Sequence, residues 1–153
     1  MLGQQAPDFA LESSTGQPIQ LKDLLGSFVV LIFYPANDSP TCNKQLDELN
    51  EKWEGFLEVN ARVFGINTAT IEKQKEFCVR RRLQFPILSD PRGAVAKKYK
   101  AFLPLIPFNR RTVVAICPAG KIVFYVRGKP DPFQILAAIK AAKNDDGTNC
   151  TSL

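Results

Sequence analysis

The chain has 153 residues and a mass of 17.0 kDa, which is enough for one domain with a single core. Its composition, 45% hydrophobic and 23% charged, is ordinary for a globular protein and excludes wholesale disorder. The net charge of +5 is spread along the chain, and the absence of histidine excludes Ser–His–Asp and Cys–His catalysis as well as imidazole metal ligands. A reactive cysteine or hydroxyl group must therefore be activated by an arginine, a lysine, a carboxylate or a helix N-terminus.

The first half of the chain predicts a hairpin, two strands and a helix. Apolar and polar residues alternate in 8–12 and 19–21 around a polar turn, which is the pattern of a short β-hairpin. The run 28–34 is apolar throughout and predicts a central strand buried on both faces, and residues 61–67 predict a second strand. Between these strands, apolar residues recur three and four positions apart over 42–56, as in an amphipathic helix.

The remaining elements follow in chain order: a helix capped by Thr70 and running to about Leu83, an extended segment 85–88, a short helix 94–100, a hairpin 112–116 and 121–126, and a helix beginning at Pro132. Strands that alternate with helices favour a mixed sheet covered on both faces, with right-handed crossovers between parallel strands. A terminal hairpin and helix packed on a βαβ unit is the thioredoxin-like arrangement of the α/β class. We expect residues 1–143 to form this one domain, with an N-terminal β-hairpin, and residues 144–153 to form a flexible polar tail.

No membrane segment or secretory signal is visible. The longest apolar run, 28–34, is far shorter than the roughly 18 residues that span a bilayer, and residues 1–8 lack a basic and an apolar region. We therefore expect a cytoplasmic protein without membrane association; an organellar protein whose transit peptide has been removed is the alternative. The densest basic cluster, 80–82, has no interleaved aromatic residues, so we expect a solvated helix end and no nucleic-acid binding.

The four cysteines are Cys42, Cys78, Cys117 and Cys150. No two of them are two to four residues apart, which excludes a compact zinc site and a thioredoxin-type Cys-x-x-Cys motif. Their wide spacing in a chain without a visible signal peptide argues against a structural disulfide framework. We expect a structural role for Cys117, at a strand end, and we place Cys150 in the flexible tail.

Cys42 is the candidate reactive group. It falls in the first turn of a helix that follows the buried strand, where free N–H groups and the positive end of the helix dipole favour a thiolate. In open α/β sheets, active sites lie beyond the carboxyl end of a strand. Pro35 ends the strand and can shield the sulfur, and the Ser39 hydroxyl can accept from the backbone and donate to the sulfur or to a substrate oxygen. A small buried core cysteine is the alternative, and position alone does not separate the two interpretations.

The sequence Pro35-x-x-x-Ser39-x-x-Cys42 resembles the peroxiredoxin signature Pro-x-x-x-Thr/Ser-x-x-Cys. The resemblance extends over nearly the whole chain, through 6–9, 85–90 and 120–122, and Gln45 is typical of the peroxiredoxin Q (bacterioferritin comigratory protein) branch. It implies a thiol-dependent peroxidase with a thioredoxin-like fold, no bound cofactor and no metal. The implied substrates are hydrogen peroxide and small organic hydroperoxides.

The resemblance also implies residue roles. Cys42 becomes the peroxidatic cysteine, which attacks the O–O bond and is oxidised to a sulfenic acid. Counting back from Gly120, Arg111 falls at the position of the family's arginine, whose guanidinium stabilises the thiolate and the charge on the leaving oxygen. Arg110 is the alternative by one position, and either arginine can instead be a solvated strand end.

A second cysteine then has to resolve the sulfenic acid. Asp47 stands where many peroxiredoxin Q members have a resolving cysteine, so that variant is excluded, whereas Cys78 on the next helix resembles a second variant. Since a disulfide needs Cα atoms within about 7 Å, we expect both helices to unwind locally, and we expect the cluster 80–82 to lower the pKa of Cys78.

The resulting Cys42–Cys78 disulfide is expected to be reduced by an external dithiol, usually thioredoxin in this family, and the protein to be a monomer. Two alternatives stay open. One is a one-cysteine peroxidase in which an outside thiol resolves Cys42 and Cys78 only packs in the core. The other is a redox sensor or holdase that relays oxidation to a partner protein.

Overall fold

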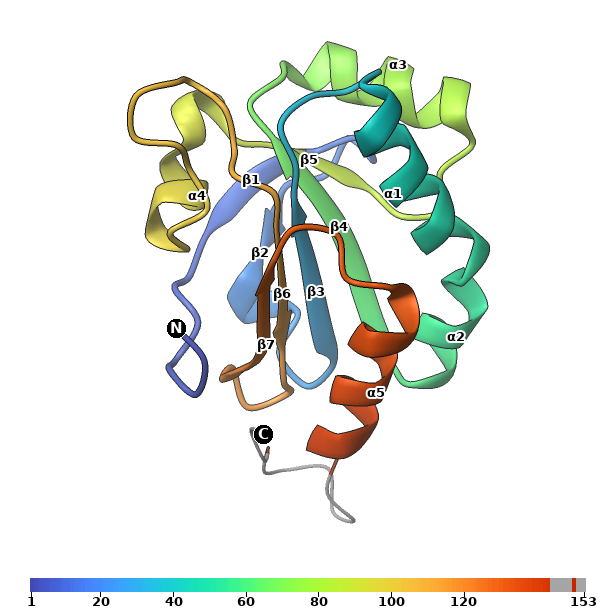
Figure 1. Ribbon diagram of the computed structural model, residues 1–153, viewed down its shortest axis with the longest axis vertical. Coiled ribbons are helices and arrows are strands. Elements are labelled where there is room, and N and C mark those ends of the chain that lie inside the picture. The colour runs from blue at the N-terminus through green and yellow to red at the C-terminus, as the bar shows by residue number, and fades with distance from the viewer. Residues whose placement is uncertain (144–149, 151–153) are drawn as a thin grey trace.

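The structure, a computed structural model, describes residues 1–143 and residue 150 (Figure 1). Its elements in chain order are β1 (Ala10–Ser13), β2 (Ile19–Gln20), the 3-10 turn η1 (Leu21–Asp23), β3 (Phe28–Phe33), α1 (Pro40–Glu51), α2 (Trp53–Glu58), β4 (Ala61–Asn67), α3 (Ile71–Arg81), β5 (Ile87–Ser89), η2 (Pro91–Gly93), α4 (Ala94–Lys98), β6 (Thr112–Ile116), β7 (Ile122–Arg127) and α5 (Pro132–Ala142). The strands form one mixed sheet in the order β2-β1-β5-β4-β3-β6-β7. This confirms the predicted α/β class and the N-terminal hairpin, in which β1 and β2 are antiparallel.

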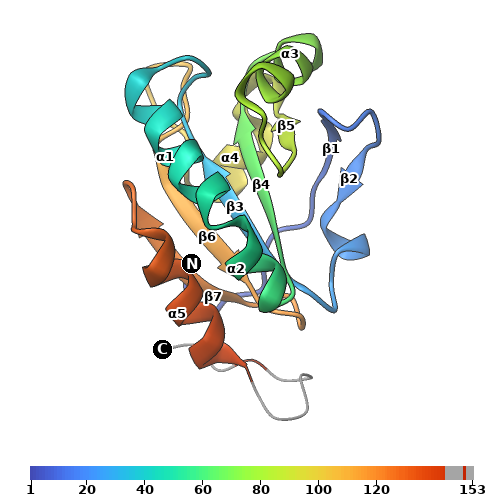
Figure 2. The same cartoon turned by 90° about the vertical axis from the view of Figure 1, so that its right-hand side faces the viewer.

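β3 is the centre of the sheet and is buried along its whole length. It pairs in parallel with β4 and antiparallel with β6, and its side chains alternate between two cores. Val30 and Ile32 face the core beneath α1, α2, α3 and α5, whereas Val29 and Leu31 face the core that includes α4. Figure 2 shows α1, α2 and α5 together in front of the sheet, with α4 behind it. A strand buried on both faces accounts for the continuous apolar run in the sequence.

The first long helix differs from its prediction in two respects, and the helices predicted to end at about Leu83 and at Lys100 end two residues earlier, at Arg81 and Lys98. The helix predicted over 42–56 begins earlier, at Pro40, and is interrupted at Lys52, whose φ of −97° and ψ of 13° are not helical. The N–H of Lys52 bonds to the carbonyls of Asn50 and Leu49, which tightens the end of α1 before α2 begins. The predicted Thr70 cap is confirmed, because its side chain accepts from the N–H of Lys73.

The predicted tail, 144–153, lies outside the described residues except for Cys150. Within the described part of the chain, no helix is both long enough and apolar enough to cross a bilayer.

The candidate site lies at one end of the sheet. β3 and β4 are parallel, so their carboxyl ends lie side by side, and the loops that follow these two strands carry the candidate site residues.

Candidate active site

Cys42 lies in the first turn of α1 and is fully buried, with 0% of its surface exposed. Ser39 is the N-cap, and its Oγ accepts from the N–H of Cys42 at 3.5 Å. Pro40 occupies the first helical position, where its lack of an N–H costs nothing. The sulfur therefore lies at the N-terminal, positive end of the helix dipole and is buried away from bulk water.

Arg111, immediately before β6, reaches the sulfur. Its Nη1 lies 3.3 Å from Cys42 Sγ and donates to Gln45 Oε1 at 3.1 Å. Because Thr112 pairs with Phe33, Arg111 lies beside the carboxyl end of β3, where the Cys42 loop begins. The neighbouring Arg110 is exposed, and its backbone N–H bonds to Ala101. Of the two arginines considered from the sequence, Arg111 is thus the one that contacts Cys42.

A buried polar network connects the Cys42 loop to β4 and α3. The Tyr34 hydroxyl donates to Asn37 Oδ1 at 2.6 Å, and Asn37 Nδ2 donates to Gln74 Oε1 at 2.8 Å. Asn67 closes the network, since its Nδ2 donates to Asn37 at 3.0 Å and its Oδ1 accepts from Gln74 Nε2 at 2.5 Å. The sequence analysis missed this set. The one available signal was Gln74, a polar residue on the buried stripe of its helix.

Two ion pairs strengthen the same junction. Arg80 binds both carboxylate oxygens of Asp38, at 2.7 and 2.9 Å, and Arg81 binds Asp47 at 2.5 Å. Asp38 has a φ of 64°, a left-handed conformation that Asp tolerates better than most residues. The hydrogen bond from Arg80 holds the pKa of Asp38 below its ordinary value. Two arginines of the basic cluster are thus occupied by carboxylates of the Cys42 loop and α1.

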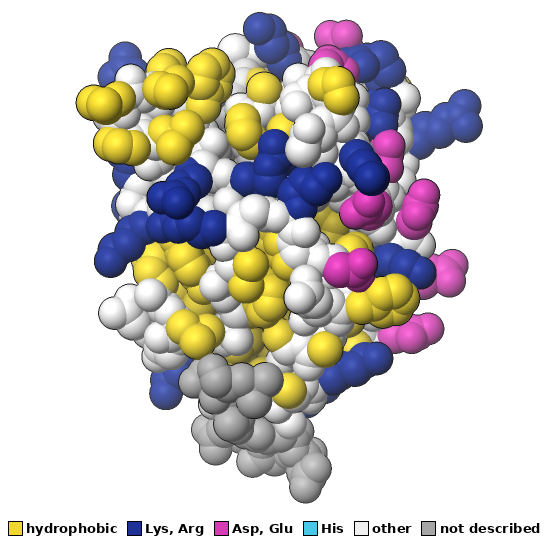
Figure 3. Space-filling model, viewed as in Figure 1, with side chains coloured by type: hydrophobic (Ala, Val, Ile, Leu, Met, Phe, Trp, Pro, Cys, Tyr) yellow, Lys and Arg dark blue, Asp and Glu magenta, His cyan; other side chains and the backbone are white. Residues whose placement is uncertain are grey.

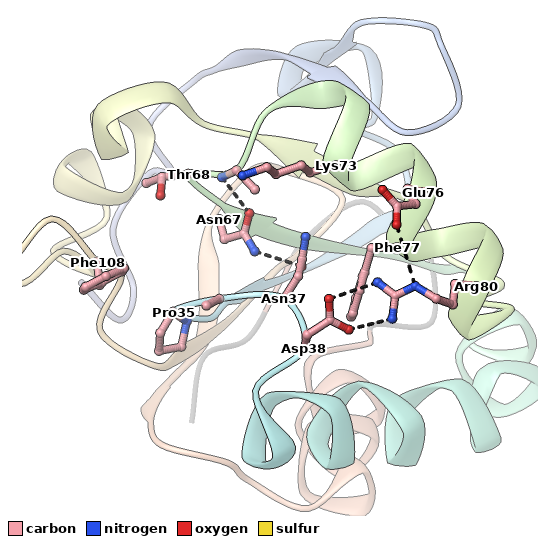
Figure 4. A pocket seen from close by; sticks show the side chains of 12 residues that line it. Pro35, Asn37, Asp38, Asn67, Thr68, Lys73, Glu76, Phe77, Arg80 and Phe108 are labelled. Atoms are coloured by element: carbon pink, nitrogen blue, oxygen red, sulfur yellow. Dashed lines mark hydrogen bonds and ion pairs between the residues drawn. The ribbon is translucent and has the colours of Figure 1, made fainter.

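A pocket of about 440 Å³ opens beside the Cys42 loop, between that loop and α3 (Figure 4). Pro35, Phe77 and Phe108 form apolar parts of its wall, and Asn67 and Lys73 are among its polar groups. Phe108 belongs to a loop after α4 whose residues 105, 106 and 108 are exposed apolar side chains. Figure 3 shows an apolar patch over the same region of the molecule. The pocket therefore combines an apolar wall with polar groups beside the Cys42 loop.

Comparisons with known proteins identify the family. The model of the AhpC/TSA family matches residues 2–125. The chain belongs to this family. A Mycobacterium tuberculosis relative that bears a peroxiredoxin name is 38% identical over 117 residues, which are 73% of this chain and 76% of the relative. "Peroxiredoxin Q, chloroplastic" of Arabidopsis thaliana is 38% identical over 97 residues, which are 63% of this chain and 45% of that protein.

Solved structures agree with this assignment. The crystal structure of peroxidoxin BcpB from Mycobacterium tuberculosis matches with a TM-score of 0.86 and 31% identity, over 94% of this chain and 98% of that one. Xanthomonas campestris Peroxiredoxin Q has the same fold, with a TM-score of 0.80 at 22% identity, over 87% of this chain and 90% of that one. The thioredoxin-like fold expected from the sequence is therefore confirmed, and the protein is a thiol peroxidase of the peroxiredoxin family.

In this peroxiredoxin Cys78 lies on α3 and is a free thiol, as is Cys42. Burial raises the pKa of the Cys78 thiol, and hydrogen bonds from Ser14 and from the Ile87 backbone offset only part of that increase. The expectation that the arginine cluster lowers this pKa is wrong in direction. Arg80 and Arg81 instead pair with carboxylates, and desolvation of the thiol dominates.

This raised pKa predicts slow alkylation of Cys78 at neutral pH. Burial favours the neutral thiol, so the reactive thiolate fraction at pH 7 is smaller than in an unfolded chain. In the Cys42→Ser variant, we expect iodoacetamide to modify Cys78 more slowly than in the urea-unfolded protein. The rate should still be rising above about pH 8.5, the ordinary midpoint of a cysteine thiol. A midpoint below that value would show that nearby cations dominate after all.

Cys117 and Cys150 form a disulfide with Cα atoms 6.0 Å apart. The expectation of no structural disulfide is therefore wrong for this pair. Cys117 is fully buried and follows β6 at the end opposite Arg111, so the bond attaches residue 150 to the far end of the sheet. Cys117 is six positions after Arg111 along extended chain, which is about 20 Å at about 3.3 Å per position. The disulfide is thus remote from Cys42.

Proposed function

We propose that Cys42 is the peroxidatic cysteine and that Arg111 is its electrophilic partner. The single observation that carries this proposal is the 3.3 Å contact between Arg111 Nη1 and Cys42 Sγ at the start of α1. The thiolate attacks the terminal oxygen of a hydroperoxide and the O–O bond breaks, so that the sulfur becomes a sulfenic acid while the peroxide is reduced to water or an alcohol. Arg111 donates to the negative charge that develops on the leaving oxygen.

The neighbouring residues support this chemistry in different ways. Ser39 caps the helix and offers a hydroxyl to the peroxide, and Pro35 covers the loop side of the site. Gln45 accepts from Arg111 and so fixes the guanidinium. A fully buried sulfur admits a small terminal oxygen rather than a bulky electrophile. We therefore propose hydrogen peroxide and small organic hydroperoxides as substrates, the latter favoured by the apolar pocket wall.

We further propose that Cys78 resolves the sulfenic acid as an intramolecular disulfide, which thioredoxin or a similar dithiol then reduces. Both cysteines lie on the same face of the sheet, at the core beneath α1 and α3. Structures of Xanthomonas campestris Peroxiredoxin Q include two mutants, in each of which one cysteine is replaced by serine. The two replaced cysteines are 36 residues apart, and Cys42 and Cys78 have the same separation. A one-cysteine cycle, with an external thiol in place of Cys78, is the alternative mechanism.

The protein's setting is also a proposal. Resemblance to the peroxiredoxin Q branch supports a monomer built from one domain, 1–143, with a short tail. We propose a cytoplasmic protein, or an organellar one as in the relatives named chloroplastic, that binds neither membranes nor nucleic acid. The ion pairs of Arg80 and Arg81 support the last point, because they occupy most of the densest basic cluster. In a reducing cytoplasm the Cys117–Cys150 bond would form mainly under oxidative load.

A disulfide map tests the proposal. The fully reduced protein receives one equivalent of hydrogen peroxide, free thiols are blocked, and peptides are identified by mass spectrometry without reduction. We expect a linked Cys42–Cys78 pair in the wild type and no such link in the Cys42→Ser variant. Oxidation confined to Cys42 would indicate the one-cysteine cycle, and an unreacted Cys42 would overturn the assignment.

Turnover separates the peroxidase from a redox sensor or holdase. With thioredoxin and its reductase present, a peroxidase consumes many equivalents of peroxide, whereas a sensor consumes about one for each partner that it oxidises.

A further inference from the structure

The loop between α4 and β6 carries three exposed apolar side chains close together in the sequence. Leu105 is 94% exposed, and Ile106 and Phe108 are about half exposed. We call residues 103–108 the apolar loop. It lies at the same end of the sheet as the loop that leads into α1, at the top of Figure 1. Apolar side chains that gather on the surface of a folded domain commonly mark a contact site.

The apolar loop is held in one shape by its own backbone. The N–H of Leu103 donates to the carbonyl of Phe108 at 3.0 Å, and the N–H of Phe108 donates to that of Ile106 at 2.8 Å. Pro104 and Pro107 restrict the backbone between these bonds. Because the loop is already ordered, a partner that binds it pays little conformational entropy.

The surroundings of the apolar loop are basic. Residues 91–130 contain nine Lys and Arg residues and no Asp or Glu, so this segment alone carries more positive charge than the net +5 of the chain. Four of these cations are exposed and form no ion pair with any described residue: Lys97, Lys100, Arg110 and Arg127. We call these four the basic rim. Figure 3 shows Lys and Arg side chains directly below the apolar patch, whereas Asp and Glu lie toward the opposite side of the view.

The apolar loop adjoins the active site. Phe108 also lines the pocket beside the Cys42 loop, and Arg111, three residues further on, contacts Cys42 Sγ at 3.3 Å. The two carboxylates that line this pocket both lie within ion-pair distance of Arg80, so their charge is already balanced. A protein that binds the apolar loop is therefore placed beside the segment that carries Cys42.

We propose that the apolar loop and the basic rim form the docking surface for the reductant, an acidic dithiol protein of the thioredoxin class. The inference rests on the proposed Cys42–Cys78 disulfide. A thiolate of the reductant attacks one sulfur of this bond, the S–S bond breaks, and a mixed disulfide forms. The second thiolate of the reductant then attacks the mixed disulfide. Two electrons thus pass to the enzyme, both of its sulfurs leave as thiols after protonation, and the reductant is left as a disulfide.

Other occupants fit this surface less well. A second copy of the chain would bring two basic rims together, and like charges across an interface repel. A lipid surface accepts side chains that project from a protein, but here the surface also has a notch of about 390 Å³, lined by Lys97, Phe102 and residues 103–107. Such a notch accepts a projecting apolar side chain of a protein, with a carboxylate of the partner beside the lysine.

The rate constant for reduction of the peroxide-oxidised protein tests the apolar loop. The two probes are a thioredoxin of net negative charge and dithiothreitol, which needs no docking surface. Leu105→Ser removes the most exposed apolar side chain, and Leu57→Ser is the matched control, because Leu57 is 55% exposed on α2. We expect the thioredoxin rate constant to be about tenfold lower in Leu105→Ser, since a leucine is no longer buried on docking, and unchanged in the control. Reduction by dithiothreitol and oxidation of Cys42 by peroxide should be equally fast in all three proteins.

Charge reversal tests the basic rim. Lys97→Glu should lower the thioredoxin rate constant about fivefold at low salt. Lys121→Glu is the matched control, because Lys121 is an exposed cation of the same acid-free segment at the far end of β6. The rate constant of the wild type should fall as the ionic strength rises from about 0.01 to about 0.15 M, where the screening length shortens from about 30 to about 8 Å. This salt dependence needs no variant, so it is decisive even if a substituted chain folds poorly.

The outcomes separate the docking surface from the cycle on which it depends. If no Cys42–Cys78 disulfide forms, or if dithiothreitol reduces it and thioredoxin does not, the proposed cycle is wrong and the docking surface with it. If thioredoxin reduces the wild type, Leu105→Ser and Lys97→Glu equally fast and without dependence on salt, the cycle stands and the docking surface is refuted. Equal rates together with binding to phosphatidylglycerol vesicles that is lost in Leu105→Ser would assign the surface to a membrane instead.

Discussion

Replacing Arg111 by Gln should slow the reaction of Cys42 with hydrogen peroxide by about a hundredfold or more. The guanidinium lies 3.3 Å from the sulfur in a site closed to bulk water, where a fixed donor to developing negative charge has its largest effect. Removal of one such donor costs about 10²–10³ in rate in comparable sites. The measurement is the second-order rate constant for loss of the Cys42 thiol under excess peroxide.

Arg110→Gln provides a matched control, because it removes the same charge one residue away without touching the sulfur. We expect its rate constant to stay within about twofold of the wild type, as for an exposed side chain outside the site. Arg111→Lys should recover only part of the loss, since an ammonium group lacks the rigid planar geometry with which Arg111 Nη1 contacts both Cys42 and Gln45. Equal losses in the Arg110 and Arg111 variants would mean that net charge, rather than contact, governs the rate.

Local sequence signals were sufficient to predict the position of Cys42 in the fold. A serine and a proline before a helical periodicity define where α1 begins, so the position of Cys42 in the first turn followed from the sequence. Arg110 and Arg111 could not be separated in this way. Which of two neighbouring residues reaches the sulfur depends on the strand register, here the pairing of Thr112 with Phe33, and a shift of one residue reverses the two sides.

The contacts that join α3 to the Cys42 loop were beyond the sequence for a different reason. Asp38 and Arg80 are 42 positions apart, and Asn37 and Gln74 are 37 apart, so no local pattern connects them. An arginine-rich helix end is normally solvated, which is how this cluster was interpreted. The Arg80–Asp38 pair involves a residue in a left-handed turn, and the Arg81–Asp47 pair joins α3 to α1; neither feature leaves a mark on local periodicity.

The same limit explains the missed disulfide. The spacing of the cysteines and the lack of a visible signal peptide indicate only whether a disulfide framework is common in such a chain. They do not predict which chain segments lie close together in the folded protein. Cys117 and Cys150 are 33 residues apart, and α5 with β7 lies between them. Because α5 returns along the sheet toward the end of β6, the chain brings the two cysteines together without any local signal (Figure 1).

Loss of this disulfide should lower stability strongly and leave catalysis intact. A cross-link that closes a loop of 33 residues restricts the unfolded chain, and chain entropy assigns it about 3–4 kcal/mol of unfolding free energy. For a domain of this size, we expect the melting temperature of Cys150→Ser to fall by about 8–15 °C under oxidising conditions. This variant keeps the fully buried Cys117 side chain and changes only Cys150, which packs against the core from outside.

Reduction provides the control for that prediction. With dithiothreitol, the wild type should melt within a degree or two of Cys150→Ser, because both then lack the cross-link. The rate constant for oxidation of Cys42 should be the same in the two proteins, since the bond lies about 20 Å from Arg111 along β6. A slower Cys42 in Cys150→Ser, at a temperature where both chains are folded, would mean that the far end of the sheet controls the site. An unchanged melting temperature would mean that the cross-link adds nothing that the core does not already supply.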